Sequence, residues 1–327
     1  DLRGWEWRYL WQFCQSDAQS VLTKKTESIT SLSVSHDGKW VAAGEDAKGG
    51  LSVWNLETKE EIRLPAGDGR VRLAFSTREP LLAFALSAIG DRPNRVVLWD
   101  PSTRAVVREL AIDTPCAGLF FSDDGQTLIA HMIGSATGEI CRWRVADGSK
   151  LANYPALSRG TSTRWAPFGV SRDAKVAAHA AAAGELRVVD LTTGRELWTA
   201  KAADEYVLSM AFSPDGKILA TGGGFVEPDI RLWDVASGQE IGRLKGHRSF
   251  IAHLLFWPDG KMLASASADQ TISLWDVASG RSLQTLRGHK LEVWRLALLP
   301  DNKTLVSGCK DGAINLWDVT APHAKSE

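Results

Sequence analysis

The chain has 327 residues, and its 38 Lys or Arg and 39 Asp or Glu residues give a formal net charge of −1. This balance excludes the strongly basic surface that draws in nucleic acid or anionic membranes. The 44% of hydrophobic residues excludes an intrinsically disordered chain. No apolar run reaches the roughly 18 residues of a membrane span, no signal peptide is visible and the four cysteines lack paired spacing. We therefore expect a cytoplasmic protein with reduced thiols and no membrane contact, with secretion as the alternative.

The first residues, 1–15, read DLRGWEWRYLWQFCQ and precede any repeat. Trp7, Leu10, Trp11 and Cys14 would share one face of a helix. The aromatic residues from Trp5 onward also alternate along the segment, as they would in a strand. Periodicity alone therefore leaves helix and strand open for this segment.

A short apolar run that ends in Trp, usually followed by Asp, recurs along the rest of the chain. These anchors are Trp54, Trp99, Trp143, Trp233, Trp275 and Trp317, with Val189 in the one gap of the register. Successive anchors are 45, 44, 46, 44, 42 and 42 residues apart. A period of about 40–45 residues is typical of a four-stranded propeller blade. Seven anchors therefore predict an all-β fold, a seven-bladed β-propeller.

A turn motif of the type SPDGK, found at Ser213, precedes most anchors. Pro presets one backbone angle and Gly takes a positive φ, which predicts a tight turn between antiparallel strands. Each unit reads as strand a, turn, strand b, loop, strand c ending at the anchor, and strand d. Too few residues follow Trp317 for a last strand d, so we expect Ala18–Lys24 to complete the last blade and close the ring.

These residues resemble the WD40 family over residues 18–319, most closely in the last two blades, where Gly-His precedes strand a and the anchor reads LWD. The resemblance implies a buried hydrogen-bond network in each of these two blades. Its members are His247, Ser265, Asp269 and Trp275 in blade 6, and His289, Ser307, Asp311 and Trp317 in blade 7. The other five blades lack Gly-His at this place, and we expect them to rely more on apolar packing.

The string RGWEWRYLW is similar to the segment that precedes the propeller in large bacterial WD40 proteins, some of which carry a Ser/Thr kinase domain. In those proteins the segment is helical. The resemblance therefore implies a helical linker over residues 1–16, a propeller over residues 17–327, and a kinase or other domain in the same polypeptide as a partner.

Motifs for catalysis are missing from the sequence: it contains no CxxC, HExxH or P-loop pattern. His247, Ser265 and Asp269 have the residue types of a catalytic triad. The same trio recurs in blade 7, however, and a triad needed once would not repeat with the fold. The histidines show no metal-ligand spacing. We therefore expect no catalytic residue, no cofactor and no metal.

The loops between strands b and c are long in blades 1, 2, 3 and 5, and they share one face, the top face, with the loops between strands d and a. Insertions gathered on one face often mark the binding face of a repeat protein. Aligning the blades on their turns gives a predicted binding set on this face: Arg70, Arg164, Tyr206, Phe250, Glu292, Trp294 and Lys310. The alternative is that Phe250 and Trp294 pack between adjacent blades.

The fold and the missing catalytic motifs favour a non-catalytic platform for protein–protein interaction, the scaffold or regulatory module of a larger bacterial protein. Its partner would be another protein or a peptide, and not nucleic acid. The alternative is an enzyme or small-molecule sensor with its site in the central channel. That alternative needs acidic, histidine or arginine side chains on the innermost strands, which read as mostly apolar.

Overall fold

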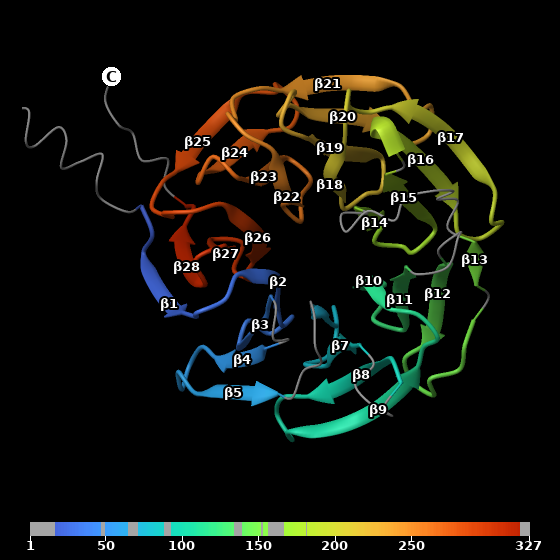
Figure 1. Cartoon of the computed structure of the whole chain (residues 1–327), viewed down its shortest axis with the longest axis vertical. Helices are drawn as coiled ribbons and strands as arrows, with labels where there is room; N and C mark the ends of the chain where they lie inside the picture. Colours follow the sequence, from blue (N-terminus) through green and yellow to red (C-terminus); the bar gives the residue numbers. More distant parts are fainter. Residues whose placement is uncertain are drawn as a thin grey trace, which may run out of the picture.

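The computed structural model describes residues 17–46, 50–64, 71–87, 93–133, 139–151, 153–155, 167–180 and 182–320. These residues are almost entirely β-structure, with the short 3-10 turn η1 (Ala182–Gly184) as the one helical element among them. The predicted helix over residues 1–16 lies outside the described residues. The strands form seven antiparallel sheets of four strands, arranged as blades around a ring (Figure 1). The all-β, seven-bladed propeller predicted from the seven anchors is confirmed.

Within each blade the strands run from a at the centre to d at the rim. Blade 1 contains β2 (Ile29–Val34), β3 (Trp40–Glu45), β4 (Leu51–Asn55) and β5 (Glu61–Leu64). Blade 2 contains β6 (Arg72–Phe75), β7 (Leu82–Leu86), β8 (Arg95–Asp100) and β9 (Ala105–Ala111). Blade 3 contains β10 (Cys116–Phe121), β11 (Thr127–Met132), β12 (Glu139–Arg144) and β13 (Tyr154–Pro155).

The remaining blades follow in chain order around the ring. Blade 4 contains β14 (Phe168–Val170), β15 (Val176–Ala180), β16 (Glu185–Asp190) and β17 (Glu196–Lys201). Blade 5 contains β18 (Val207–Phe212), β19 (Ile218–Gly223), β20 (Ile230–Asp234) and β21 (Glu240–Leu244). Blade 6 contains β22 (Ile251–Phe256), β23 (Met262–Ser267), β24 (Ile272–Asp276) and β25 (Ser282–Leu286).

Blade 7 is assembled from both ends of the described chain. Its sheet has the order β1-β28-β27-β26, with β26 (Val293–Leu298), β27 (Thr304–Cys309), β28 (Ala313–Asp318) and β1 (Ser20–Lys24). The strand β1 pairs antiparallel with β28, from Ser20 opposite Leu316 to Lys24 opposite Ala313. Figure 1 shows β1, in blue, beside β28, in red.

The turns between strands a and b owe their shape to short polar side chains. In blade 5, Ser213 Oγ donates to Asp215 Oδ1 at 2.6 Å, and the same serine oxygen accepts the N–H of Ile218 at 2.9 Å. Gly216 takes a positive φ of 71°, which a residue with a Cβ rarely adopts. The serine and aspartate thus fix the turn, and the chain returns as strand b.

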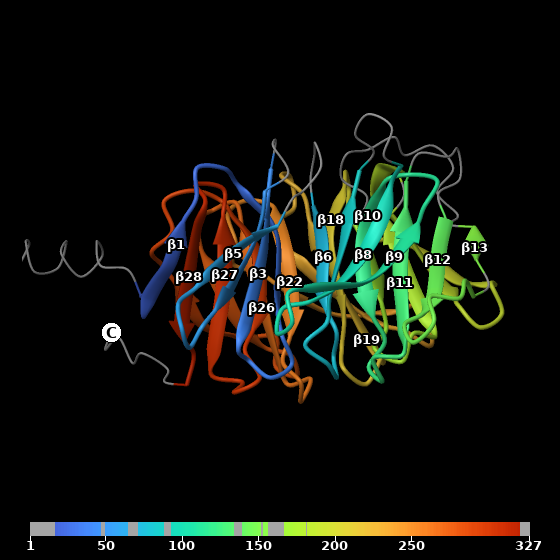
Figure 2. The ribbon, with the colours of Figure 1, turned by 90° about the horizontal axis from the view of Figure 1, so that it is seen from below.

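The hydrophobic core is divided among the boundaries between blades. Seven clusters of buried apolar side chains are found among the described residues, and each joins strands of two neighbouring blades. The cluster at the boundary of blades 7 and 1 contains Ile29, Val306 and Ile314, all fully buried. Strands cross from one face of the disc to the other (Figure 2), so the loops gather on the two faces.

Candidate functional site

Blade 6 contains the chain of hydrogen-bonded side chains that the family resemblance implies. His247 Nε2 lies 2.7 Å from Ser265 Oγ, and His247 Nδ1 lies 2.8 Å from Asp269 Oδ2. The indole N–H of Trp275 donates to Ser265 Oγ at 2.8 Å. Burial alone would raise the pKa of the Asp269 carboxyl, but hydrogen bonds from His247 and Thr271 hold that pKa well below its usual range. These buried polar groups therefore satisfy one another inside the blade.

Blade 7 carries the same four residue types, but its chain of hydrogen bonds is open at one end. His289 Nε2 lies 2.6 Å from Ser307 Oγ, which also accepts the indole N–H of Trp317 at 2.7 Å. His289 Nδ1, in contrast, is buried without a hydrogen-bond partner. The family resemblance implied a hydrogen bond between His289 and Asp311, and this is wrong for blade 7: Asp311 does not bind His289 as Asp269 binds His247.

Two substitutions next to the network explain the difference between these blades. In blade 6, Thr271 Oγ1 donates to Asp269 Oδ1 at 2.6 Å and fixes the carboxylate. In blade 7, Ala313 stands at the place of Thr271 and Cys309 at the place of Ser267. The carboxylate of Asp311 therefore lacks the hydroxyl that holds its counterpart.

Blade 1 fills the same internal position with a charge. Lys25 precedes strand a by four residues, as His247 does. Its ammonium donates to Ser52 Oγ at 3.1 Å, forms an ion pair with Glu61 and lies 5.0 Å from the ring centroid of Trp54. Burial alone would raise the pKa of Glu61, but hydrogen bonds from Lys25 and Ser52 lower it to about 2. Blade 1 therefore has a polar network of its own beside the apolar packing expected for it.

The expectation of apolar packing fits blades 3 and 5, which place the buried Ile112 and Ala203 at this position. Blade 5 also keeps Thr221, whose Oγ1 accepts the indole N–H of Trp233 at 2.9 Å. Because different chemistry fills equivalent positions of different blades, these side chains have the character of blade interiors rather than of one reaction site.

Polar side chains of the innermost strands link each of three pairs of neighbouring blades around the centre of the ring. Three such contacts join Ser31 Oγ to the N–H of Leu73 at 3.3 Å, Ser209 Oγ to the carbonyl of Ile251 at 3.0 Å, and His253 Nδ1 to the N–H of Leu296 at 3.3 Å. Burial, with a smaller effect of the charge of Arg295, lowers the pKa of His253 to about 3. The imidazole is therefore neutral at physiological pH, and its Nδ1 serves the structure by accepting the N–H of Leu296.

An exposed group of apolar side chains lies on the top face where blades 5 and 6 meet. Phe225 and Val226, in the loop between β19 and β20, are 66% and 67% exposed, and Tyr206, directly before β18, is 51% exposed. The rings of Phe225 and Phe250 meet edge-on, with centroids 4.7 Å apart. We call Tyr206, Phe225, Val226 and the half-buried Phe250 the apolar patch. Large apolar side chains that stay exposed together are characteristic of interaction surfaces.

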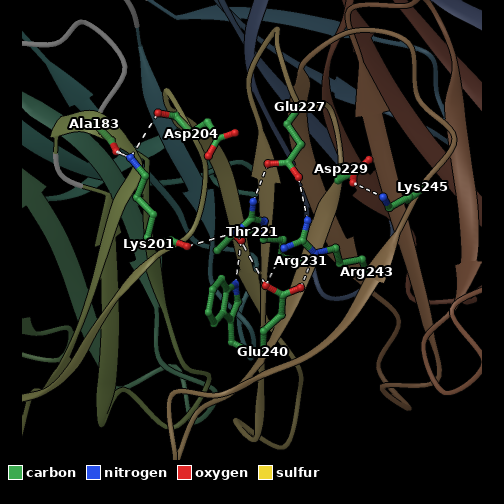
Figure 3. A network of polar contacts seen from close by, with 11 residues as sticks. Ala183, Lys201, Asp204, Thr221, Glu227, Asp229, Arg231, Glu240, Arg243 and Lys245 are labelled. Carbon is green, nitrogen blue, oxygen red and sulfur yellow. Dashed lines mark hydrogen bonds and ion pairs between the residues drawn. The ribbon is translucent and has the colours of Figure 1, made fainter.

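The loop that carries Phe225 and Val226 is braced by ion pairs (Figure 3). Glu227, the next residue, accepts from Arg231 at 2.5 Å and from Arg243 at 2.8 Å, which ties the loop to strands c and d of blade 5. At the neck of the loop, the N–H of Gly223 donates to the carbonyl of Asp229 at 3.0 Å. A Cβ at Gly223 would lie only 2.0 Å from the Glu227 carbonyl oxygen, so this tight neck requires glycine. The patch is therefore presented by a fixed loop.

The predicted binding set is divided by the structure. Tyr206 and Phe250 belong to the apolar patch. Glu292 and Lys310 pair with each other in blade 7, with the carboxylate and the ammonium 2.7 Å apart. Trp294 is partly buried in β26, where the strand register shifts between Val293 and Arg295. Arg70 and Arg164 lie outside the described residues.

Phe225 and Val226 are absent from the predicted binding set, although they lie in the long loop between strands b and c of blade 5. The alignment on the a–b turns selects residues next to strand a and passes over loops that differ in length. Two apolar residues inside a glycine-rich loop are the signal that could have found them.

Comparison with known proteins identifies the repeat. The WD40 family, described as WD domain, G-beta repeat, matches residues 17–55, 194–234, 238–276 and 280–318. Each match runs from strand d of one blade through strand c of the next, and the first match begins with β1. A search of curated proteins found no match to the chain. Within the described ranges, no helix is long and apolar enough to cross a membrane.

Proposed function

The chain is a WD40-repeat β-propeller, and we propose that it is a non-catalytic platform that binds another protein or a peptide through the apolar patch. WD40 propellers generally mediate protein–protein interactions and are typically not catalysts. Three statements are specific to this proposal. The binding site lies on the top face, the apolar patch forms it, and the partner is not nucleic acid.

The exposure of Phe225 and Val226 carries the proposal. Two adjacent large apolar side chains are two-thirds exposed, and the ion pairs of Glu227 hold their loop in place. A fixed loop loses little conformational entropy when a partner binds. Aromatic side chains such as Tyr206 and Phe225 often dominate the energetics of an interface. The ion pairs around the patch, such as that of Lys245 with Asp229 at 3.3 Å, resemble the polar rim of an interface.

A capture experiment with two matched double variants tests the patch. We expect F225S/V226S to reduce recovery of the partner bound by the wild-type chain by about tenfold or more, as loss of an interface hot spot would. The control is V106S/V107S on β9, which removes two adjacent side chains that are 55% and 53% exposed on the outer rim. Equal melting temperatures would show that both variants are folded. Undiminished capture by F225S/V226S would exclude the patch as the binding surface.

We further propose that the propeller is the scaffold or regulatory module of a larger bacterial protein, in which residues 1–16 form a helical linker to a kinase or another domain. The similarity of RGWEWRYLW to such linkers supports this. We also propose that β1 closes the ring, which is supported by its pairing with β28 and by the family match that begins at residue 17.

A further inference from the structure

Three potential metal ligands meet in blade 7, at the open end of its hydrogen-bond network. A ring nitrogen of His289, the sulfur of Cys309 and a carboxylate oxygen of Asp311 all lie within 4.8 Å of one another. They come from the connection before β26, from the end of β27 and from the turn after it. His289 is only 8% exposed and Cys309 is fully buried, so both ligand atoms belong to the interior of the blade.

The imidazole is oriented for a ligand role by the network itself. The contact of Nε2 with Ser307 Oγ at 2.6 Å fixes the ring, and Nδ1 is the nitrogen that is buried without a partner. In blade 6 the equivalent nitrogen of His247 is directed at Asp269, at 2.8 Å. A hydrogen bond to the second nitrogen is the usual support of a metal-binding histidine.

We propose that His289, Cys309 and Asp311 form a zinc-binding site in blade 7, with His289 Nδ1, Cys309 Sγ and an Asp311 carboxylate oxygen as ligands and water in the fourth position. A mixed set of nitrogen, sulfur and oxygen donors fits zinc better than calcium or magnesium, which take oxygen ligands. Ligands of one tetrahedral zinc lie about 3–4 Å apart, so modest side-chain rotations would bring these three atoms together.

Charge and proton balance fit this site. A neutral imidazole, a thiolate and a carboxylate together neutralise Zn²⁺. Binding requires Cys309 to lose its thiol proton to solvent, because the thiolate is the ligand. The ammonium of Lys24 lies 3.6 Å from Asp311, and because the Lys24 side chain is 61% exposed it can turn into solvent when the cation arrives.

The three ligand residues are too far apart in the sequence to form a recognisable metal-binding motif. His289 lies 20 residues before Cys309, and no short motif links them. Blade 6 supplies the internal comparison: it has the same histidine and aspartate but Ser267 in place of Cys309.

Metal binding to the full chain tests the proposal. After treatment with a chelator and dialysis, the wild-type chain should bind one equivalent of Co²⁺ with a thiolate-to-cobalt charge-transfer band, and Zn²⁺ should displace it. C309S should lose the band, and Zn²⁺ should raise the melting temperature of the wild type but not of C309S. C309S should fold, because blade 6 carries serine at this place.

Two further variants make the result specific. Asp311→Asn retains the side-chain shape and should weaken zinc binding by about tenfold or more. Cys141→Ser changes a thiol of β12 outside the cluster and should bind both ions as the wild type does. Failure of the wild type to bind either ion, or an identical titration of C309S, would overturn the proposal.

Discussion

Blades 6 and 7 both carry His, Ser, Asp and Trp at the positions of the internal network, yet they are completed in different ways. Blade 6 is built from one continuous stretch, whereas the outer strand of blade 7 comes from the other end of the described chain. In blade 6 both ring nitrogens of His247 have hydrogen-bond partners, whereas in blade 7 Nδ1 of His289 has none. A shared repeat therefore determines where the backbone runs, while flanking residues such as Thr271 and Ala313 decide whether the buried polar groups are satisfied.

The largest expected effect concerns the outer strand of blade 7. Removing residues 1–24 deletes β1, leaves β28 with an unpaired edge and uncovers part of the cluster between blades 7 and 1. We expect a loss comparable with the whole stability of a domain, about 5–15 kcal/mol, and hence an unfolded or aggregated chain. Removing residues 1–16 should leave the melting temperature within a few degrees. Thermal melts followed by circular dichroism compare the two, and coincident curves would contradict the proposed role of β1.

An intermediate effect is expected at the two histidines. His247→Ala removes a side chain with partners on both nitrogens and leaves Asp269 with one fewer donor, so it should cost about 1–3 kcal/mol. His289→Ala removes one hydrogen bond, that with Ser307, and should cost less. Urea denaturation in the presence of a chelator gives both values free of any bound metal. Equal losses would mean that the open end of the blade 7 network has no energetic consequence.

The smallest effect is expected at Thr271. Thr271→Ala makes blade 6 resemble blade 7 and removes the hydroxyl that fixes Asp269, which should cost about 1 kcal/mol. Because Thr271 and His247 bind the same carboxylate, their substitutions should be non-additive in a double-mutant cycle. Strict additivity would show that the threonine does not act through Asp269.

The course of the backbone was predictable because the anchors recur at a nearly constant spacing. Even the blade without an anchor tryptophan was placed correctly, since Val189 pairs with Ala177 as Trp233 pairs with Leu219 in blade 5. Alternating apolar residues and turn motifs are local signals, so they survive the loss of one tryptophan.

The departures were not predictable, because each depends on contacts between residues distant in the chain. Lys25 reaches Glu61 only because the blade folds strand d beside strand c. Phe225 and Val226 read as part of a variable loop. That this loop is held in place depends on the bonds of Glu227 with Arg231 and Arg243, which the sequence does not show. The missing contact between His289 and Asp311 reflects Ala313, which lacks the hydroxyl that Thr271 gives to the carboxylate of blade 6.

The placement of the hydrophobic clusters between blades has a consequence for how the ring bears load. Each sheet contributes one apolar face to each of two boundaries, so no blade owns a core of its own. A force applied at one blade is thereby passed to both neighbours instead of being absorbed within a single sheet. Each blade is therefore held in place by its two neighbours, all the way around the ring.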